Sequence, residues 1–183
     1  MSVTALDPRT ALVVVDLQNG IVALPTAHPA ADVVAKSATL ADAFRAKGLP
    51  VVLVRVTGGA PGRTEGPQPS GSPAADWADL VPEMSPKDGD FVVTKQQWGA
   101  FYGTDLDLRL RRLGVTQVVL TGIATSIGVE STARSAHEHG YHVTVAVDAV
   151  TDMNAEAHAN SVQRIFPRLG QTGTTAEIVE LLG

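Results

Sequence analysis

Apolar, β-branched runs recur along this chain and are separated by segments with helical periodicity. Unbroken apolar runs are typical of strands that are covered on both faces, as in a parallel sheet. Their alternation with helices implies right-handed crossovers, so we predict an α/β fold: a three-layer, doubly wound (Rossmann-like) parallel sheet of about six strands. The predicted strands are residues 11–17, 50–56, 91–94, 117–121 and 142–147, with a weaker candidate at 171–175.

Helices are expected between these strands, at residues 30–47, 104–113 and 129–138. Apolar side chains at helical spacing on the first two mark the faces that should pack on the sheet. They are Val33, Val34, Leu40, Ala41 and Phe44 in the first helix, and Leu106, Leu110 and Leu113 in the second. A chain of 183 residues is long enough for one independent core, and we expect a single domain over 1–183.

Residues 57–90, called the arm below, depart from this pattern because they are rich in Gly and Pro. The sequence offers only a short possible helix around 74–81. One interpretation is a surface loop without a specific role. The other is a lid over the site or an arm that contacts a second subunit, because long loops in compact domains are often functional.

Composition excludes several classes of function. A net charge of −5 and a pI near 5.4 argue against nucleic acid or an acidic membrane surface as the main partner. No apolar stretch approaches the roughly 20 residues that span a bilayer, and the first residues lack a signal-peptide pattern. We therefore expect a cytoplasmic protein with a small-molecule substrate. The chain has no cysteine, which excludes disulfides and thiolate metal sites.

Charged residues stand where two of the predicted strands end. Asp16 follows an apolar run, Lys95 ends the third strand, and Gly128 opens the helix after the fourth. In open parallel sheets, ligands bind outside the carboxyl ends of the strands, where the strand order reverses. Burial should raise the pKa of Asp16 and a nearby ammonium should lower it, so the pair could transfer a proton near neutral pH. The simpler interpretation is a strand-end ion pair.

The segment 115–133 adds a second feature to this expected crevice. Its strand runs through a short polar turn directly into a helix of small residues. Such a junction gathers unpaired backbone N–H groups and the positive end of a helix dipole, which suits an anion or a developing negative charge. The residues expected to line the pocket around it are Gln18, Trp98, Phe101, Ala124, Thr125 and Ser126.

Four segments in this order resemble the isochorismatase-like (cysteine hydrolase) superfamily. They are ALVVVDLQNG at 11–20, FVVTKQQWGAFYGTDLDLRLRRLG at 91–114, VTQVVLTGIATSIGVESTA at 115–133 and GYHVTVAVDAVTD at 140–152. The resemblance covers nearly the whole chain and implies the isochorismatase-like hydrolase fold. It also implies a non-proline cis peptide at Ile123-Ala124.

The resemblance implies roles for the residues at the strand ends. In cysteine members a thiol stands at the position of Gly128, activated by the residues that match Asp16 and Lys95, while N–H groups matching Ala124 and Gly128 hold the oxyanion. Isochorismatases proper have glycine there, and their aspartate acts as general acid on a vinyl ether. For this chain the resemblance therefore implies a hydrolase without a cysteine nucleophile, acting on a small, carboxylate-bearing molecule. Asp16 would be its general acid/base and Lys95 the electrostatic partner.

No cofactor and no metal are expected. The nicotinamidase branch of the superfamily carries its metal-binding histidines in the loop after the second strand, and 57–90 contains no histidine. No G-x-G-x-x-G motif for a dinucleotide follows the first strand. Isochorismatases also carry a glutamine and an arginine beyond the second strand, where this chain offers Val56 and only Arg63 as a candidate.

The sequence leaves two alternatives open. The chain could be a catalytically degenerate binding or assembly protein of the same fold. It could also be a serine hydrolase, because Ser126, Asp148 and His158 follow one another in the order found in α/β-hydrolases.

A homo-oligomer, either a dimer or a tetramer, is expected from the resemblance. Its contacts would involve the arm, a helix around 154–165, and the apolar residues Trp77, Ile165 and Phe166, which are flanked by polar loops.

Overall fold

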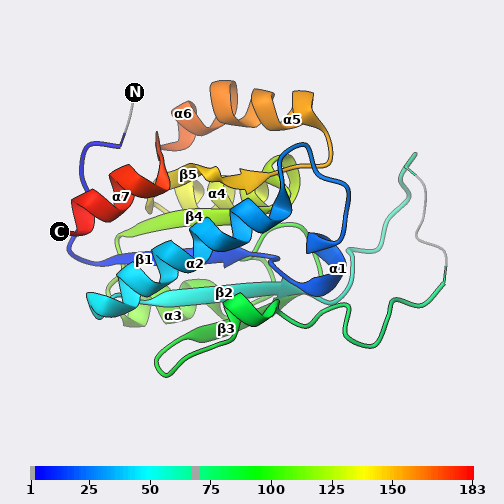
Figure 1. Cartoon of the computed structure of the whole chain (residues 1–183), viewed down its shortest axis with the longest axis horizontal. Coiled ribbons are helices and arrows are strands. Elements are labelled where there is room, and N and C mark those ends of the chain that lie inside the picture. Colours follow the sequence, from blue (N-terminus) through cyan, green and yellow to red (C-terminus); the bar gives the residue numbers. More distant parts are fainter. Residues whose placement is uncertain (1–2, 67–70) are drawn as a thin grey trace.

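The computed structural model describes residues 3–66 and 71–183, and it contains the predicted six-stranded parallel sheet. The strand order is β3-β2-β1-β4-β5-β6, so the chain first builds outward from β1 in one direction and then in the other (Figure 1). The order therefore reverses between β1 and β4, at the centre of the sheet. The strands are β1 Thr10–Val15, β2 Val51–Val56, β3 Phe91–Lys95, β4 Gln117–Ile123, β5 His142–Thr151 and β6 Gln171–Gly173.

Helices cover both faces of the sheet, which confirms the three-layer fold. Helices α2 and α7 lie on one face, and α3, α4 and α6 lie on the other (Figure 1). The α-helices are α1 Asn19–Val22, α2 Ala30–Ala46, α3 Leu106–Arg112, α4 Glu130–Glu138, α5 Ala155–Asn160, α6 Phe166–Leu169 and α7 Thr175–Leu182. A 3-10 helix spans Pro82–Met84, and π-helical turns span Thr125–Val129 and Ser161–Ile165. No helix in the described part of the chain is long and apolar enough to cross a membrane.

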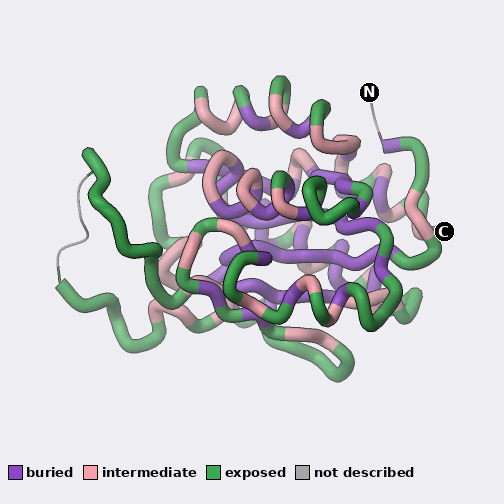
Figure 2. Tube along the Cα trace, turned by 180° about the vertical axis from the view of Figure 1, so that it is seen from behind, coloured by how far each residue is buried: buried purple, intermediate pink, exposed green. Residues whose placement is uncertain are grey.

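The core is divided into two layers by the alternation of side chains along the strands. In β1, Ala11, Val13 and Val15 pack on one side of the sheet, while Leu12 and Val14 pack on the other. All six residues of this strand are buried, and the central strands form the continuous buried zone in Figure 2. This is why the strands read in the sequence as unbroken apolar runs.

The expected inner face of α2 is confirmed, since the five apolar residues predicted to lie on it are all buried. The expectation for α3 is wrong at one position. Leu106 and Leu110 are buried, but Leu113 is 38% exposed. The helix ends at Arg112, and Leu113 is its C-cap residue, outside the helical periodicity that placed it on the inner face.

The short helix expected around 74–81 does not form. Its backbone carbonyls are used elsewhere: Trp77 O accepts the N–H of Gly20, and Asp79 O accepts the N–H of Asn19. The segment thus becomes a turn bonded to the start of α1, and Leu80 forms a bridge with Gln18. Most of the arm is exposed (Figure 2), and its residues 67–70 lie outside the described residues.

The expected subunit contact at Phe166 is wrong, because this side chain is only 1% exposed and belongs to the core. Trp77 and Ile165 are half-buried and stay available to a second subunit. The homo-oligomer itself stays a prediction.

Helix α3 offers a matched pair of leucines for testing the core. Leu110 is fully buried and Leu108 is 50% exposed. We expect Leu110→Ala to lower the free energy of unfolding by about 2–5 kcal/mol because it leaves a cavity, and Leu108→Ala by less than about 0.5 kcal/mol. Urea denaturation would measure both. Equal losses would contradict the placement of α3 on the sheet.

Candidate active site

The carboxyl ends of β1, β3 and β4 surround a small cavity of about 180 Å³. It lies where the strand order reverses, the position at which doubly wound sheets bind ligands. The residues that line it are Asp16, Ile21, Leu24, Val56, Gly58, Gly59, Lys95, Gln97, Trp98, Ile123, Ala124, Ile127, Gly128 and Met153.

Asp16 leaves β1 in a left-handed conformation, with φ of 55°. A non-glycine residue in this region is uncommon and is strained unless its surroundings enforce it. Here the Asp16 N–H donates to Val54 O at 2.9 Å, which anchors the residue to the end of β2. The backbone thus turns out of the sheet at the residue whose carboxyl group lines the cavity.

Lys95 lies two strands away, at the end of edge strand β3. Its Nζ donates to Asp16 Oδ2 at 2.7 Å and to Gln97 O at 3.1 Å. Both charged residues are buried, and Asp16 Oδ1 has no hydrogen-bond partner among the described residues. Burial raises the pKa of Asp16 to about 6, against the opposing effect of Lys95.

The turn Thr125–Val129, called the Gly128 turn below, follows β4 after a cis peptide at Ile123-Ala124. A Cβ atom at Gly128 would lie 3.1 Å from Asp16 Oδ2 and 3.1 Å from Val15 Cγ1. Either contact is closer than ordinary van der Waals contact. Glycine at this position therefore keeps the space over the Asp16 carboxyl group open.

Thr132 joins the two walls of the cavity. Its buried hydroxyl donates to Gly128 O at 2.7 Å and accepts the N–H of Ala100 at 3.1 Å. The segment after β3, which carries Trp98, is thereby tied to the first turn of the helical segment after β4. Both of the hydroxyl's hydrogen bonds serve this link.

These features agree with the comparison with known proteins. The family model described as the isochorismatase domain matches residues 10–177. The chain belongs to the isochorismatase family of hydrolases.

Relatives of the family match the chain over most of its length. It is 46% identical over 179 residues to the isochorismatase family protein YwoC of Bacillus subtilis, which covers 94% of this chain and 93% of that protein. The structure of an isochorismatase family protein from Burkholderia thailandensis is 47% identical, with a TM-score of 0.94 and 99% of each chain covered. The ureidoacrylate amidohydrolase RutB of Methylobacterium radiotolerans is 32% identical over 213 residues, covering 98% of this chain and 82% of that enzyme.

Within this family fold, the structure brings together only part of the predicted site. Asp16, Lys95, Gly128, Trp98 and Ala124 all line the cavity. Four residues that we expected to contact the substrate do not line it, and each has another use. They are Gln18, Phe101, Thr125 and Ser126.

Two of these four residues stabilise the surroundings of the site. The Gln18 amide is fully buried; it accepts the N–H of Val56 at 2.8 Å and donates to Val56 O at 3.0 Å and Trp77 O at 3.2 Å. It thereby fastens the arm to the end of β1. Phe101 packs beside Tyr141 and His139 on the helical face behind the site.

The other two lie in the Gly128 turn but bond away from the cavity. Thr125 is buried and its hydroxyl lies 2.9 Å from His158 Nδ1. Ser126 donates its N–H and its hydroxyl to Asp152 Oδ2, at 2.7 and 2.8 Å. The bond to His158 holds the turn against α5, and the bonds to Asp152 hold it against the end of β5.

The serine-hydrolase alternative is not supported by this geometry. Ser126 bonds to Asp152, whereas His158 bonds to Thr125. Asp148 accepts hydrogen bonds from Thr175 instead. The three residues that would form a nucleophilic triad therefore serve three separate contacts.

Sequence reasoning missed the apolar side of the cavity. Leu24 follows α1, Met153 follows β5, and Ile127 lies within the Gly128 turn. None of them carries a charged or reactive group, so no local pattern marked them. Across residues 3–66 and 71–183, no group of three or more His, Asp or Glu residues is arranged to hold a metal ion.

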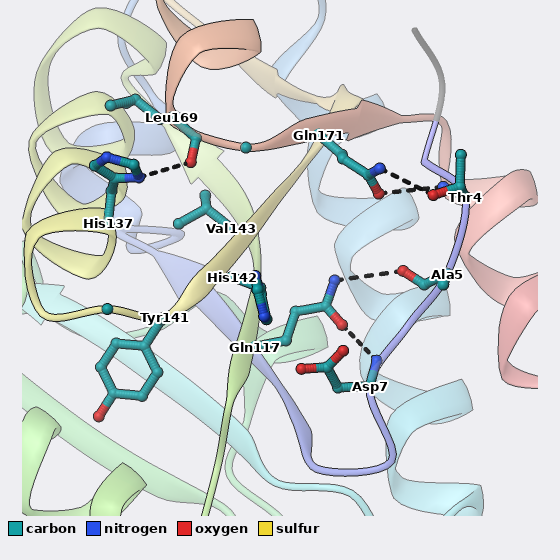
Figure 3. A pocket seen from close by; sticks show the side chains of 12 residues that line it. Thr4, Ala5, Asp7, Gln117, His137, Tyr141, His142, Val143, Leu169 and Gln171 are labelled. Atoms are coloured by element: carbon teal, nitrogen blue, oxygen red, sulfur yellow. Dashed lines mark hydrogen bonds between the residues drawn. The ribbon is translucent and has the colours of Figure 1, made fainter.

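A larger cavity of about 500 Å³ lies at the opposite edge of the sheet, beside the first residues of β4, β5 and β6 (Figure 3). Its polar side chains are used to hold the chain segments around it. Gln117 accepts the N–H of Asp7 at 2.6 Å, and Gln171 binds Thr4 at 2.9 and 3.2 Å. For chemistry, the smaller cavity with its buried Asp16 is therefore the better candidate.

The raised pKa of Asp16 can be measured directly. We expect the Asp16 carboxyl carbon to titrate in ¹³C NMR spectra with a midpoint near pH 6, because burial disfavours the charged form. Lys95→Met should shift the midpoint higher, since it removes the ammonium that lowers this pKa.

Asp42 is the internal control for this titration. It is an exposed aspartate whose pKa is lowered by its hydrogen bond from Lys87, so it should titrate below 3.8 in both proteins. An Asp16 midpoint at or below that of Asp42 would contradict the assignment.

Proposed function

We propose that this isochorismatase-family chain hydrolyses a small molecule through proton transfer by Asp16, without a covalent intermediate. The supporting observation is the state of the Asp16 carboxyl group. It is buried beside the cavity, its pKa is raised to about 6, and its Oδ1 has no hydrogen-bond partner among the described residues. A protonated carboxyl group with a free oxygen can donate a proton to a substrate.

The reaction can be written for an enol ether, the bond type suggested by the glycine at position 128. The Asp16 carboxyl group protonates the terminal alkene carbon, which leaves an oxocarbenium ion. Water adds to the carbon atom of this oxocarbenium ion, and one proton of the water molecule passes to the Asp16 carboxylate. The resulting hemiketal breaks its C–O bond and releases an alcohol and a carbonyl compound. This hydrolysis balances in atoms and electrons without an oxidant or a metal.

The remaining residues of the site have supporting roles in this proposal. Lys95 stabilises the Asp16 carboxylate after the proton has left, because its Nζ is 2.7 Å from Oδ2. The backbone at Ala124 and Gly128 also lines the cavity and would donate hydrogen bonds to a polar oxygen of the substrate. The relative RutB is named as an amidohydrolase, which supports hydrolysis as the general reaction class.

A variant pair distinguishes proton transfer by Asp16 from the serine mechanism. We expect Asp16→Asn to lower kcat/KM by about 10²-fold or more, the usual effect of losing a general acid. Ser126→Ala should retain most activity, because its hydroxyl is directed to Asp152. The measurement is turnover on a panel of small enol ethers and amides.

Mass spectrometry of the wild-type protein during turnover should find no covalent adduct. An acyl adduct that disappears in Ser126→Ala would contradict the proposal. Failure of the folded wild-type protein to turn over any member of the panel would instead favour a binding protein that has lost its activity.

Gly128→Ala tests the space over the carboxyl group. The added methyl group would lie against Asp16 Oδ2 and Val15, so we expect kcat/KM to fall by about tenfold or more through misplacement of the substrate. Gly62→Ala is the matched control, since Gly62 does not line the cavity and its Cβ would meet no other heavy atom within 4 Å. Unchanged activity in Gly128→Ala would show that this space is not used.

A further inference from the structure

Three apolar side chains stand around the mouth of the candidate active site. They come from separate segments: Leu24 after α1, Trp98 after β3 and Met153 after β5. Their exposed fractions are 38%, 65% and 41%, although all three also line the cavity. We call these residues the collar. Exposed apolar groups gathered at a pocket are a common mark of ligand contact.

Below the collar, the walls are also apolar or lack side chains. The apolar wall residues are Ile21, Val56, Ile123, Ala124 and Ile127, and the glycines are Gly58, Gly59 and Gly128. The polar side chains that line the cavity are Asp16, Lys95 and Gln97. A ligand would therefore meet polar groups at one end and hydrocarbon over the rest of its surface.

The cavity offers few groups that could form an ion pair or a hydrogen bond with a charged group on the ligand. Among the residues that the structure describes, Lys95 is the only basic one that lines it, and two of its three N–H donors are already used on Asp16 and on Gln97 O. The Gln97 amide is also occupied, because it donates to Gly99 O and Tyr102 O and accepts the N–H of Gln96. An anionic group among the apolar walls would lose its hydration without gaining a partner, which is costly.

We propose that the substrate is a small uncharged molecule with its hydrolysable group at one end and a compact apolar body that contacts the collar. This inference rests on the proposed function and departs from the carboxylate-bearing substrate expected from the resemblance. Leu24, Trp98 and Met153 are its specificity-determining residues. The cavity volume of about 180 Å³ is smaller than that of typical ligand pockets, which is ~300–1,000 Å³. The substrate must therefore be smaller than the ligands that fill such pockets.

Benzamide and benzoate are suitable probes, because they have the same number of heavy atoms and differ in charge. NMR titration of the ¹⁵N-labelled protein at pH 8, where Asp16 is ionised, would give both affinities. We expect benzamide to bind at least about tenfold more tightly than benzoate, and acetamide, which lacks the apolar body, to bind more weakly than benzamide. Benzoate binding as tightly as benzamide would overturn the proposal, and a loss of that binding in Arg63→Ala would identify a carboxylate site in its place.

Trp98→Ala tests the collar directly. We expect it to weaken benzamide binding about five- to tenfold, as for the loss of one aromatic contact. Tyr102→Ala is the matched control, because Tyr102 is 83% exposed and lies four residues further along without lining the cavity; it should leave the affinity unchanged. Leu24→Ser is a second collar variant and should weaken binding as well.

Two outcomes of these variants would overturn the inference. One is an unchanged benzamide affinity in both Trp98→Ala and Leu24→Ser. The other is a change of oligomeric state in sedimentation without a change of affinity, which would make the collar a subunit contact. Failure of the proposed function would give a different pair of results. Benzamide would bind both the wild-type protein and Asp16→Asn through the collar, but neither protein would turn over any enol ether or amide.

Discussion

The buried ion pair between Asp16 and Lys95 is the interaction that the surrounding structure must hold in place. Transferring two charges out of water is costly, and their mutual attraction does not always repay that cost. Here Lys95 reaches across the end of β2 to bond with Asp16 at 2.7 Å. Burial is the larger influence and keeps the pKa of Asp16 at about 6, above its ordinary value of 3.8. Because the folded state binds this proton more tightly than the unfolded state does, Asp16's contribution to stability is complete below pH 3.8. It is lost as the pH rises through about 6.

The packing around the pair supplies the rigidity that such a site needs. Asp16 is held in its left-handed conformation by the bond to Val54 O, and Gln18, just beyond β1, bonds to Val56 at the end of β2 and to Trp77 in the arm. On the opposite side, Thr132 links the Gly128 turn to the segment that carries Trp98. The polar residues near the cavity thus divide into two sets. One set, Asp16 and Lys95, carries the charges beside the cavity, and the other, which includes the cavity-lining Gln97, makes its hydrogen bonds to the scaffold.

This division explains how far the sequence could predict the structure. The sheet was predictable because strands buried on both faces carry unbroken apolar runs, as β1, β2 and β4 do at residues 11–15, 51–54 and 118–120. Asp16, Lys95 and Gly128 were predictable because strand ends in a parallel sheet lie at one edge. The roles of Gln18 and Thr125 were not, because an amide or hydroxyl near a site can serve substrate or backbone equally well. The turn at 74–81 also depended on distant partners, the N–H groups of Asn19 and Gly20.

The absence of a thiol is also consistent with the geometry of the cavity. At Gly128, even a Cβ atom would lie 3.1 Å from the Asp16 carboxyl oxygen. A side chain there and a substrate atom in contact with Asp16 would therefore compete for the same space. In the proposed mechanism, glycine leaves this space to the substrate, and the Asp16 carboxyl group is the reactive group nearest to it. The apolar walls strengthen that arrangement, because they exclude water from the carboxyl group and raise its pKa toward the range in which it can give up a proton.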